Sequence, residues 1–418
     1  MSLHANQLDG LAAAIARVAK LDMPADSALT AFFRANPAMG QRDRAFISEG
    51  AFAYLRRKRS LEAVADSTLP RRLALAVATR ELGHSLRDLE GALRNQEAAW
   101  LRDFKARLRD PLPDAVAADV PDWLWDALGE TYDDATRAAL TRAWQAPAPF
   151  DLRVNAVKAT RADALAALTE SGIDAVATPY SPLGIRVAGR PSLAGHPWLA
   201  DGRLEVQDEG SQLIGYLVAP RRNDMVVDFC AGAGGKTLLL GALMRSTGRL
   251  YAFDTNERRL AKLKPRLARS GLSNVHPQLI AHERDTRVKR LAGKIDRVLV
   301  DAPCTGFGTL RRNPDLKWRQ PASAVAELVQ KQKAILAGAA TLVKPGGRLV
   351  YATCSVLPEE NEEVVEAFVT AHPNFAPRDA AAELARAGIA LDTGPSLKLR
   401  PDVHGCDGFY AAVLERIG

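Results

Sequence analysis

Cysteine and histidine are scarce in this chain, with four cysteines and seven histidines among 418 residues. The cysteines lie far apart in the second half, without the CxxC spacing or the clustered histidines of a zinc site. The same spacing gives no indication of a disulfide framework. We therefore expect reduced thiols and no bound metal. The cysteines are Cys230, Cys304, Cys354 and Cys406.

Long apolar runs are also missing. No stretch approaches the ~20 uninterrupted apolar residues of a membrane-spanning helix. The first residues, MSLHANQLDGLAAAIARV, have no basic head followed by a long apolar segment, so a signal peptide is not indicated. We expect a cytoplasmic protein that does not bind membranes.

Acidic residues are outnumbered, because 56 lysines and arginines stand against 49 aspartates and glutamates. The net charge is +7 and the pI is about 9.3. Any single basic cluster could be a solvated helix face, but four of them on a basic chain favour a nucleic-acid partner. The clusters are YLRRKRS (54–60), RRLAKLKPRLARS (258–270), RDTRVKR (284–290) and LRRNPDLKWR (310–319).

The composition, 47% hydrophobic and 25% charged, is that of a folded protein with two or three domains. Residues 1–145 are rich in alanine, leucine and arginine with apolar residues at helical spacing, which predicts an all-helical domain. Short strand-like runs around one helix predict a small α/β connecting domain over residues 146–205. Residues 206–418 form the third predicted domain.

This third domain contains five apolar, β-rich runs, and helix-length segments separate the first four. Apolar strands joined by helices predict an α/β fold, a doubly wound, Rossmann-like parallel sheet covered on both faces. Ligands of such folds bind beyond the carboxyl ends of the strands. The runs are MVVDF (225–229), RLYAFD (249–254), DRVLVDAP (296–303), GRLVYATCS (347–355) and FYAAVL (409–414).

The first of these strands leads into a glycine-rich turn, DFCAGAGGKT (228–237). A phosphate-binding P-loop would need glycine where the chain has Cys230, and the dinucleotide fingerprint would need glycine where it has Thr237. Neither a nucleotide triphosphatase nor a nicotinamide oxidoreductase is therefore favoured. S-adenosylmethionine remains, since a glycine turn suits its amino-acid part and Asp254, at the end of the next strand, suits its ribose hydroxyls.

Two cysteines follow strand ends, Cys304 in DAPCTGFG and Cys354 in YATCS. Both strand ends should open on the same edge as the glycine turn, so the two thiols and Asp301 should share one cleft with the cofactor. A thiolate that adds to carbon 6 of cytosine makes carbon 5 nucleophilic enough to accept a methyl group. One thiol could attack while the other assists release. Asp301 could stabilise charge on the ring, and Lys236 could grip its oxygen or ring nitrogen.

These motifs resemble a known family. DFCAGAGGKT, DAPCTGFGTLRRNPDLKW and YATCSVLPEENEEVV are similar to the motifs of the RNA cytosine-5 methyltransferases of the RsmB/Sun and Nop group. The resemblance extends from about Val206 to HGCDGFYAAVL. More loosely, the helical half resembles the NusB-like RNA-binding domain of the bacterial 16S ribosomal RNA branch.

The resemblance implies a role for each site residue. Cys354 is expected to be the nucleophile and Cys304 to help product release, although DNA cytosine methyltransferases attack with the cysteine that corresponds to Cys304. Lys236 and Asp301 are expected to contact the base. The expected residues for S-adenosylmethionine, and for its product S-adenosylhomocysteine, are Cys230, Ala231, Gly232, Ala233, Gly234, Gly235, Lys236, Asp254, Arg259, Asp285 and Asp301.

RNA, most simply 16S ribosomal RNA, is the expected partner, and no obligate protein partner is indicated. Arg311, Arg312 and Lys317 in LRRNPDLKW are predicted to neutralise RNA phosphates beside the site. The acidic run after Cys354 is interpreted as the first turn of a helix. Two alternatives stay open: a transfer RNA substrate, and an RNA-binding module that has lost catalysis.

Overall fold

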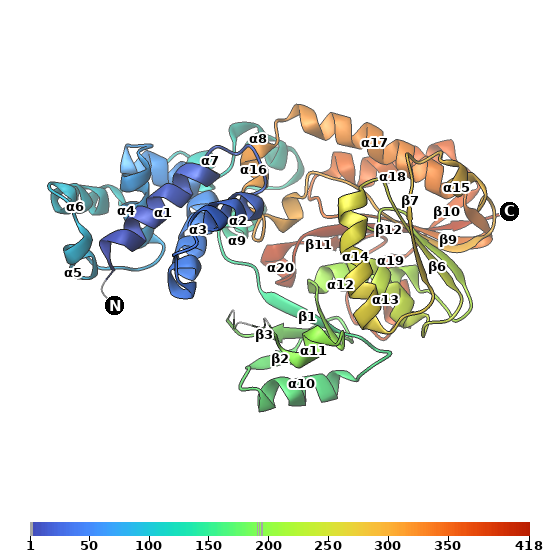
Figure 1. Ribbon diagram of the computed structural model, residues 1–418. Helices are drawn as coiled ribbons and strands as arrows, with labels where there is room; N and C mark the ends of the chain where they lie inside the picture. The colour runs from blue at the N-terminus through green and yellow to red at the C-terminus, as the bar shows by residue number, and fades with distance from the viewer. Residues whose placement is uncertain (1–2, 190, 192, 194) are drawn as a thin grey trace. The chain divides into compact units, whose positions relative to one another are not determined.

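The computed structural model describes residues 3–189, 191, 193 and 195–418. Among these residues, none of the helices combines the length and the apolar character needed to cross a membrane. Contacts between residues divide the chain into two units, each with its own hydrophobic core (Figure 1).

The first unit is helical and contains two separate parts of the chain, Met1–Pro147 and Thr309–Ala322. The second part, which we call the docked segment, was predicted to belong to the methyltransferase domain. The helices of this unit are α1 (Ala5–Val18), α2 (Ala25–Ala35), α3 (Gln41–Ala65), α4 (Pro70–Arg80), α5 (Leu86–Leu89), the 3₁₀ helix η1 (Glu90–Ala92), α6 (Glu97–Arg107), α7 (Asp114–Ala117), α8 (Asp122–Thr131), α9 (Asp134–Trp144) and, in the docked segment, α16 (Leu316–Arg319).

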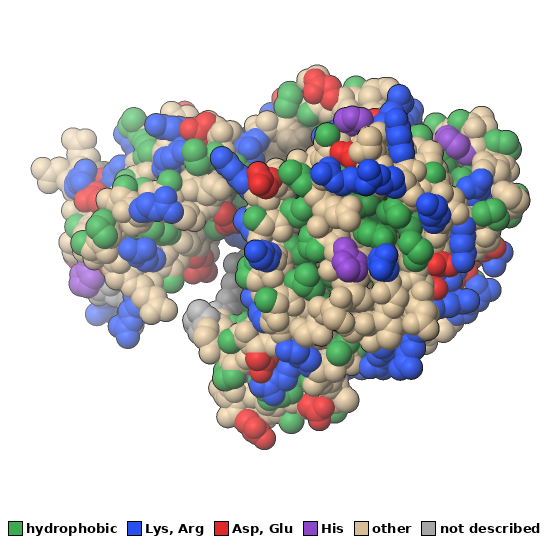
Figure 2. Space-filling view, turned by 45° about the vertical axis from the view of Figure 1, so that its right-hand side comes forward, with side chains coloured by type: hydrophobic (Ala, Val, Ile, Leu, Met, Phe, Trp, Pro, Cys, Tyr) green, Lys and Arg blue, Asp and Glu red, His purple; other side chains and the backbone are tan. Residues whose placement is uncertain are grey.

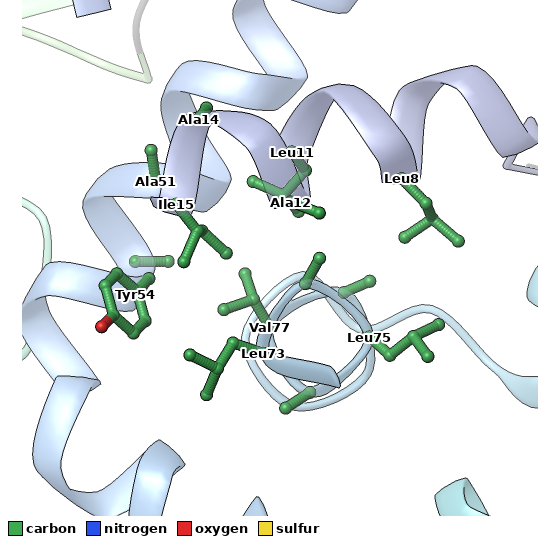
Figure 3. Packing of buried hydrophobic residues seen from close by; sticks show 14 of the residues in the cluster. Leu8, Leu11, Ala12, Ala14, Ile15, Ala51, Tyr54, Leu73, Leu75 and Val77 are labelled. Carbon is green, nitrogen blue, oxygen red and sulfur yellow. The ribbon is translucent and has the colours of Figure 1, made fainter. Parts of the chain in front are cut away.

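The core of the helical unit follows from the helical spacing of its apolar residues. Leu8, Leu11 and Ile15 lie on one face of α1 and are fully buried, packed with residues of α3 and α4 (Figure 3). Tyr54 of α3 and Val77 of α4 belong to the same cluster. The prediction of a helical first domain is therefore confirmed.

The docked segment is held in the helical unit by hydrogen bonds to the backbone of α3. The Trp318 indole donates to the Leu55 carbonyl over 2.7 Å, and the Lys317 ammonium donates to the Arg56 carbonyl over 3.0 Å. The Arg56 guanidinium donates in return to the Arg311 carbonyl over 3.2 Å. Trp318 also packs against the helical core.

The second unit begins with a small antiparallel sheet in the order β2-β3-β1-β4. Its helix α10 is capped by Thr160, whose hydroxyl accepts from the Asp163 amide over 3.2 Å. The elements are β1 (Phe150–Val154), α10 (Arg161–Glu170), β2 (Ala175–Ala177), β3 (Gly184–Val187), α11 (Pro197–Ala200) and β4 (Leu204–Val206).

The rest of this unit is built on a larger sheet in the order β10-β12-β9-β8-β5-β6-β7, with β11 paired to β12. Strands β5 to β9 are parallel, whereas β10, β11 and β12 form antiparallel pairs. All five predicted strands are present. The strands are β5 (Met225–Asp228), β6 (Arg249–Asp254), β7 (Val275–Leu279), β8 (Ile295–Asp301), β9 (Val343–Thr353), β10 (Phe375–Arg378), β11 (Leu397–Leu399) and β12 (Phe409–Arg416).

Helices cover both faces of this sheet, as the apolar runs predict. In β9, Val350 and Ala352 face the cluster formed with α12, α13, α14 and α19, while Leu349 and Tyr351 face the cluster formed with α17 and α18. The helices are α12 (Glu209–Val218), α13 (Gly235–Leu243), α14 (Glu257–Ser270), α15 (Thr286–Lys289), η2 (Phe307–Thr309), α17 (Ser323–Ala340), η3 (Pro358–Glu360), α18 (Glu362–Ala371), α19 (Ala380–Arg386) and α20 (Pro401–His404).

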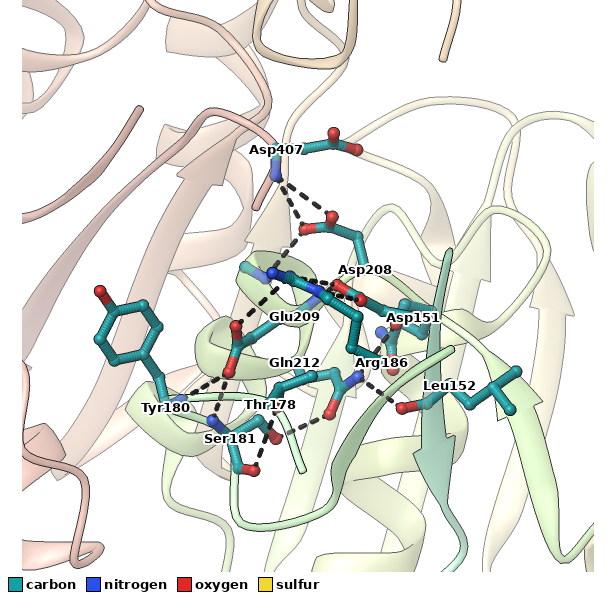
Figure 4. Close-up of polar contacts among 12 residues, drawn as sticks. Asp151, Leu152, Thr178, Tyr180, Ser181, Arg186, Asp208, Glu209, Gln212 and Asp407 are labelled. Atoms are coloured by element: carbon teal, nitrogen blue, oxygen red, sulfur yellow. Dashed lines mark hydrogen bonds and ion pairs between the residues drawn. The ribbon is translucent and has the colours of Figure 1, made fainter. Parts of the chain in front are cut away.

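A buried polar network joins the small sheet to α12 (Figure 4). Arg186 of β3 donates to both carboxylate oxygens of Asp151 in β1, over 2.8 and 3.0 Å. Glu209 of α12 accepts from the amides of Tyr180 and Ser181, which precede β3. Because the Asp151 and Glu209 carboxylates are buried and hydrogen-bonded, they fix the small sheet beside the large one.

Candidate active site

The glycine turn between β5 and α13 has the shape that the sequence predicts. Gly234 caps α13 with φ +85°, and a Cβ there would lie 2.2 Å from the Leu263 side chain. Gly232 has φ +56° and is also in the left-handed region that favours glycine. The two ends of the turn are joined by a hydrogen bond, in which the Thr237 hydroxyl of α13 donates to the Asp228 carboxylate of β5 over 2.6 Å.

A cavity of about 740 Å³ lies beside this turn, at the carboxyl ends of the strands. That volume is in the range of about 300 to 1,000 Å³ that ligand and cofactor sites occupy. Nine of the predicted cofactor residues line it: Cys230, Ala231, Gly232, Ala233, Gly235, Lys236, Asp254, Arg259 and Asp301. The structure therefore brings most of the predicted set together.

Two predicted cofactor residues are not among the described residues that line the cavity. Gly234 is the N-cap residue of α13 and forms part of the turn itself. Asp285 caps α15, where its carboxylate accepts from the amides of Ala281 and Arg287 over 2.9 and 2.8 Å. These hydrogen bonds lower the pKa of Asp285. The neighbouring residues Ile280–Glu283 line the cavity. The contact of Asp285 itself with the cofactor stays a prediction.

The Asp254 carboxylate both lines the cavity and hydrogen-bonds the backbone of the glycine turn. Its carboxylate accepts from the Gly232 amide and from the Asn256 amide, each over 2.7 Å. A carboxylate oxygen has a second acceptor position. Asp254 can therefore accept hydrogen bonds from two ligand hydroxyls without releasing the turn, which fits the ribose of S-adenosylmethionine.

Two arginines that the sequence analysis did not single out hold the backbone of the same turn. Arg153 of β1 is buried, donates to the Gly235 carbonyl over 2.7 Å and also bonds the Gln207 side chain. Arg266 of α14 donates to the Ala233 carbonyl over 2.6 Å. Burial lowers the pKa of Arg153 to about 10, so it stays charged at neutral pH. No local motif marks these contacts, because they join elements far apart in the chain.

The predicted catalytic residues meet at one wall of the cavity. The sulfur atoms of Cys304 and Cys354 lie 3.3 Å apart, and the Lys236 ammonium pairs with the Asp301 carboxylate over 2.8 Å. All four residues line the cavity. Burial alone would lower the pKa of Lys236, but the acidic groups around it, Asp301 first among them, together raise that pKa, so Lys236 is a cation here.

The four thiols differ in their surroundings. The hydrogen bond to Cys354, together with burial, raises the pKa of the Cys304 thiol. Burial raises the pKa of Cys230, which lines the cavity but packs against the core. Cys406 is fully buried and does not line the cavity. Within the described part of the chain, no three His, Cys, Asp or Glu side chains come together as a possible metal site.

Comparison with known proteins agrees with this geometry. Residues 215–415 match the 16S rRNA methyltransferase RsmB/F family, and residues 120–193 match the ferredoxin-like domain of RsmF/B-like methyltransferases. The chain is 30% identical to the ribosomal RNA small subunit methyltransferase B of Vibrio cholerae, over 97% of this chain and 96% of that protein. This chain belongs to the RsmB/F family of methyltransferases.

Two further relatives bear on the extent of the match. A "probable ribosomal RNA small subunit methyltransferase B" of Synechocystis sp. is 34% identical over 71% of this chain, and the match covers 66% of that protein. The crystal structure of PH0851 superposes with a TM-score of 0.80 and 25% identity, over 100% of both chains. The RsmB/F resemblance predicted from the motifs is thus confirmed, as is the Rossmann-like fold.

The RsmB/F motif LRRNPDLKW does not have the predicted role throughout. Lys317 is 1% exposed and its ammonium bonds the Arg56 carbonyl, so it cannot contact RNA phosphates in this conformation. Arg311 is also buried, at 6% exposure. The prediction for Lys317 is corrected, because packing in the helical unit removes its side chain from solvent. The predicted role of Arg311 stays a prediction. Arg312 is half-buried, and its predicted role stays a prediction.

Proposed function

We propose that this chain transfers a methyl group from S-adenosylmethionine to carbon 5 of a cytosine in 16S ribosomal RNA. The observation that carries the proposal is the pair of thiols 3.3 Å apart in the wall of a cofactor-sized cavity. Cytosine-5 chemistry needs a thiol nucleophile, and a second thiol beside it can assist release. The bacterial relatives are named for methylation of the small-subunit RNA.

The cofactor would lie along the glycine turn. Asp254 would accept hydrogen bonds from its ribose hydroxyls, and Arg153 and Arg266 would hold the turn in shape. S-adenosylmethionine supplies an activated methyl group and leaves as S-adenosylhomocysteine. The open backbone at Gly232 and Gly235 gives room for the amino-acid part of the ligand.

Four side chains of the site would carry out the other steps of the reaction. Cys354, as thiolate, forms a bond from its sulfur to carbon 6 of the cytosine, which places electron density on carbon 5. Asp301 and Lys236 contact the polar edge of the ring and stabilise the charge that develops during addition. Cys304 keeps its proton because its pKa is raised, and it donates a hydrogen bond to the Cys354 sulfur as the bond to carbon 6 breaks and that sulfur leaves as a thiolate. The carbon 5 proton is lost to a base.

RNA binding is supported by charge. The net charge is +7, and Figure 2 shows Lys and Arg side chains spread over the visible face of the molecule. Such surfaces bind the phosphate backbone with a strong dependence on salt. The target cytosine would have to leave its stack to reach thiols inside a cavity.

The test is to incubate wild type, Cys354→Ala and Cys304→Ala with S-adenosylmethionine and 16S ribosomal RNA. Covalent adducts are then resolved on denaturing gels, and 5-methylcytosine is mapped. We expect methylation by wild type, an adduct that accumulates only in Cys304→Ala, and neither product with Cys354→Ala. An adduct in Cys354→Ala instead would reverse the two thiol roles.

Methylation of transfer RNA alone would move the substrate to the closest alternative. No methylcytosine and no adduct with either RNA would overturn the proposed function and favour an RNA-binding module without catalysis.

A further inference from the structure

The side chain of Glu360, in the acidic run after Cys354, is fully buried. It accepts hydrogen bonds from Thr305, which follows Cys304, and from Ser355, which follows Cys354. One carboxylate oxygen accepts from the Thr305 amide over 2.8 Å and from the Gln332 amide over 3.0 Å. The other accepts from the hydroxyls of Thr305 and Ser355. We call these four residues the Glu360 cluster. In the sequence, this acidic run predicts only the start of a helix.

The Glu360 cluster holds the backbone on both sides of Cys304. Thr305 follows Cys304 and gives Glu360 both its amide and its hydroxyl. Pro303 precedes Cys304, and its carbonyl accepts from the same Gln332 side chain over 3.0 Å. Glu360 and its partner Gln332 therefore hold the residues on either side of Cys304.

Cys354 has additional support that does not involve Glu360. The Thr353 hydroxyl donates to the Asn361 side chain over 2.5 Å, and Asn361 donates to the Ser355 carbonyl over 3.2 Å. The Ser355 amide donates to the Thr353 hydroxyl over 3.2 Å. Loss of Glu360 should therefore displace Cys304 more than Cys354.

We propose that Glu360 is a positioning residue that sets the distance between the Cys304 and Cys354 thiols and so makes product release efficient. The consequence for catalysis rests on the proposed function, whereas the positioning of the thiols does not. Glu360 touches neither sulfur in the hydrogen bonds described above. Its charge acts in the same direction, because it helps to raise the pKa of Cys304 and keep that thiol protonated.

A carboxylate is needed in this position because the cluster presents four donor groups to it. Glu360→Gln keeps the size of the side chain but replaces one acceptor oxygen with a donor amide. Either the Thr305 amide or the hydroxyl pair then loses its acceptor. Hydrogen bonds to a buried charged group are stronger than those between neutral groups, so their loss should let the residues around Cys304 move.

The first measurement tests positioning without RNA. A trivalent arsenical such as phenylarsine oxide forms two As–S bonds with a pair of adjacent thiols and releases water. We expect wild type to bind it at Cys304 and Cys354, and Glu360→Gln to bind it at least about tenfold more weakly. Cys304→Ala, which cannot bridge, gives the background from the other thiols. Glu363→Gln removes the same charge from an exposed position of α18 and should bind like wild type.

The second measurement follows the RNA adduct. If Glu360 positions Cys304, Glu360→Gln should accumulate the covalent adduct that Cys304→Ala accumulates, with kcat lowered about tenfold and KM for RNA unchanged. A purely structural role would lower the melting temperature without trapping RNA. Thr305→Val, which removes one hydroxyl from the cluster, should show the same behaviour more weakly and serves if Glu360→Gln does not fold.

Wild-type arsenical affinity and wild-type release of RNA in Glu360→Gln would overturn the proposal. If wild type binds the arsenical tightly but never methylates RNA, the proposed function is refuted. The positioning of the thiols is then decided by comparing the arsenical affinities of wild type and Glu360→Gln.

Discussion

The Cys304 and Cys354 sulfur atoms lie in hydrogen-bond contact, 3.3 Å apart, although fifty residues separate them in the chain. Strands β8 and β9 are parallel neighbours, so their carboxyl ends bring the two residues to one edge of the sheet. The contact makes the two thiols unequal, since it contributes to the raised pKa of Cys304.

The inequality predicts an order of alkylation. Iodoacetamide reacts with thiolates, and a raised pKa lowers the thiolate fraction of Cys304 and Cys230 at pH 7.5. Cys406 is protected by complete burial. We expect peptide mass mapping to find Cys354 modified first. Faster labelling of Cys304 would contradict the assignment of Cys354 as nucleophile.

The Asp254 carboxylate predicts a loss of cofactor affinity on substitution. Asp254→Asn keeps the shape of the side chain but removes the charge that would accept the ribose hydroxyls, so S-adenosylhomocysteine should bind about tenfold or more weakly by calorimetry. Glu257→Gln, an exposed carboxylate in the first turn of α14, is the matched control and should bind normally. Equal affinities for the two variants would remove Asp254 from the cofactor site.

Removal of the hydrogen bonds that Arg153 makes should lower both the stability of the protein and its affinity for the cofactor. Arg153→Met leaves the Gly235 carbonyl and the Gln207 side chain without their buried donor. The cost should be about 2 kcal/mol of unfolding free energy, together with weaker binding of S-adenosylhomocysteine. Thermal unfolding and calorimetry measure the two effects. If affinity stays normal while stability falls, the small sheet supports the fold and not the cofactor turn.

The burial of Lys317 should make the stability of the protein depend on pH. Burial lowers its pKa to about 7, against an ordinary value of about 10.4 in the unfolded chain. Between these values the unfolded state binds more protons than the folded state, so this residue makes the protein more stable as pH rises from 7 to 10. The slope is at most about 1.4 kcal/mol per pH unit.

The check is urea unfolding of wild type and Lys317→Met at pH 7 and pH 9. The difference in stability between the two proteins should shift in favour of wild type at the higher pH. A difference that does not change with pH would mean that Lys317 keeps its proton in the folded protein, as it would if the side chain were not buried in solution.

Local patterns in the sequence were sufficient for five of the eight strands of the large sheet, for the glycine turn and for the placement of the cysteines, but they did not predict β7, β10 and β11. Alternation of apolar strands and helices reports burial directly, and the carboxyl ends of parallel strands must meet at one edge. The turn from Cys230 to Gly235 could be assigned because left-handed backbone and close approach demand glycine at fixed positions. Family motifs then supplied the identity of the chemistry.

The errors and omissions share one physical cause, which is that burial and pairing of polar groups depend on partners distant in the chain. A basic run looks the same whether it faces solvent or, like Lys317, donates to a carbonyl 261 residues away. Arg153 meets the Gly235 carbonyl across 82 residues, and Glu360 meets Thr305 across 55. The sequence by itself determined which chemical groups are present and at which strand ends they lie. Only the tertiary structure decided which of them are desolvated and which hold the others in place, because the free energy of a polar group depends on whether its hydrogen bonds are made to water or to the protein.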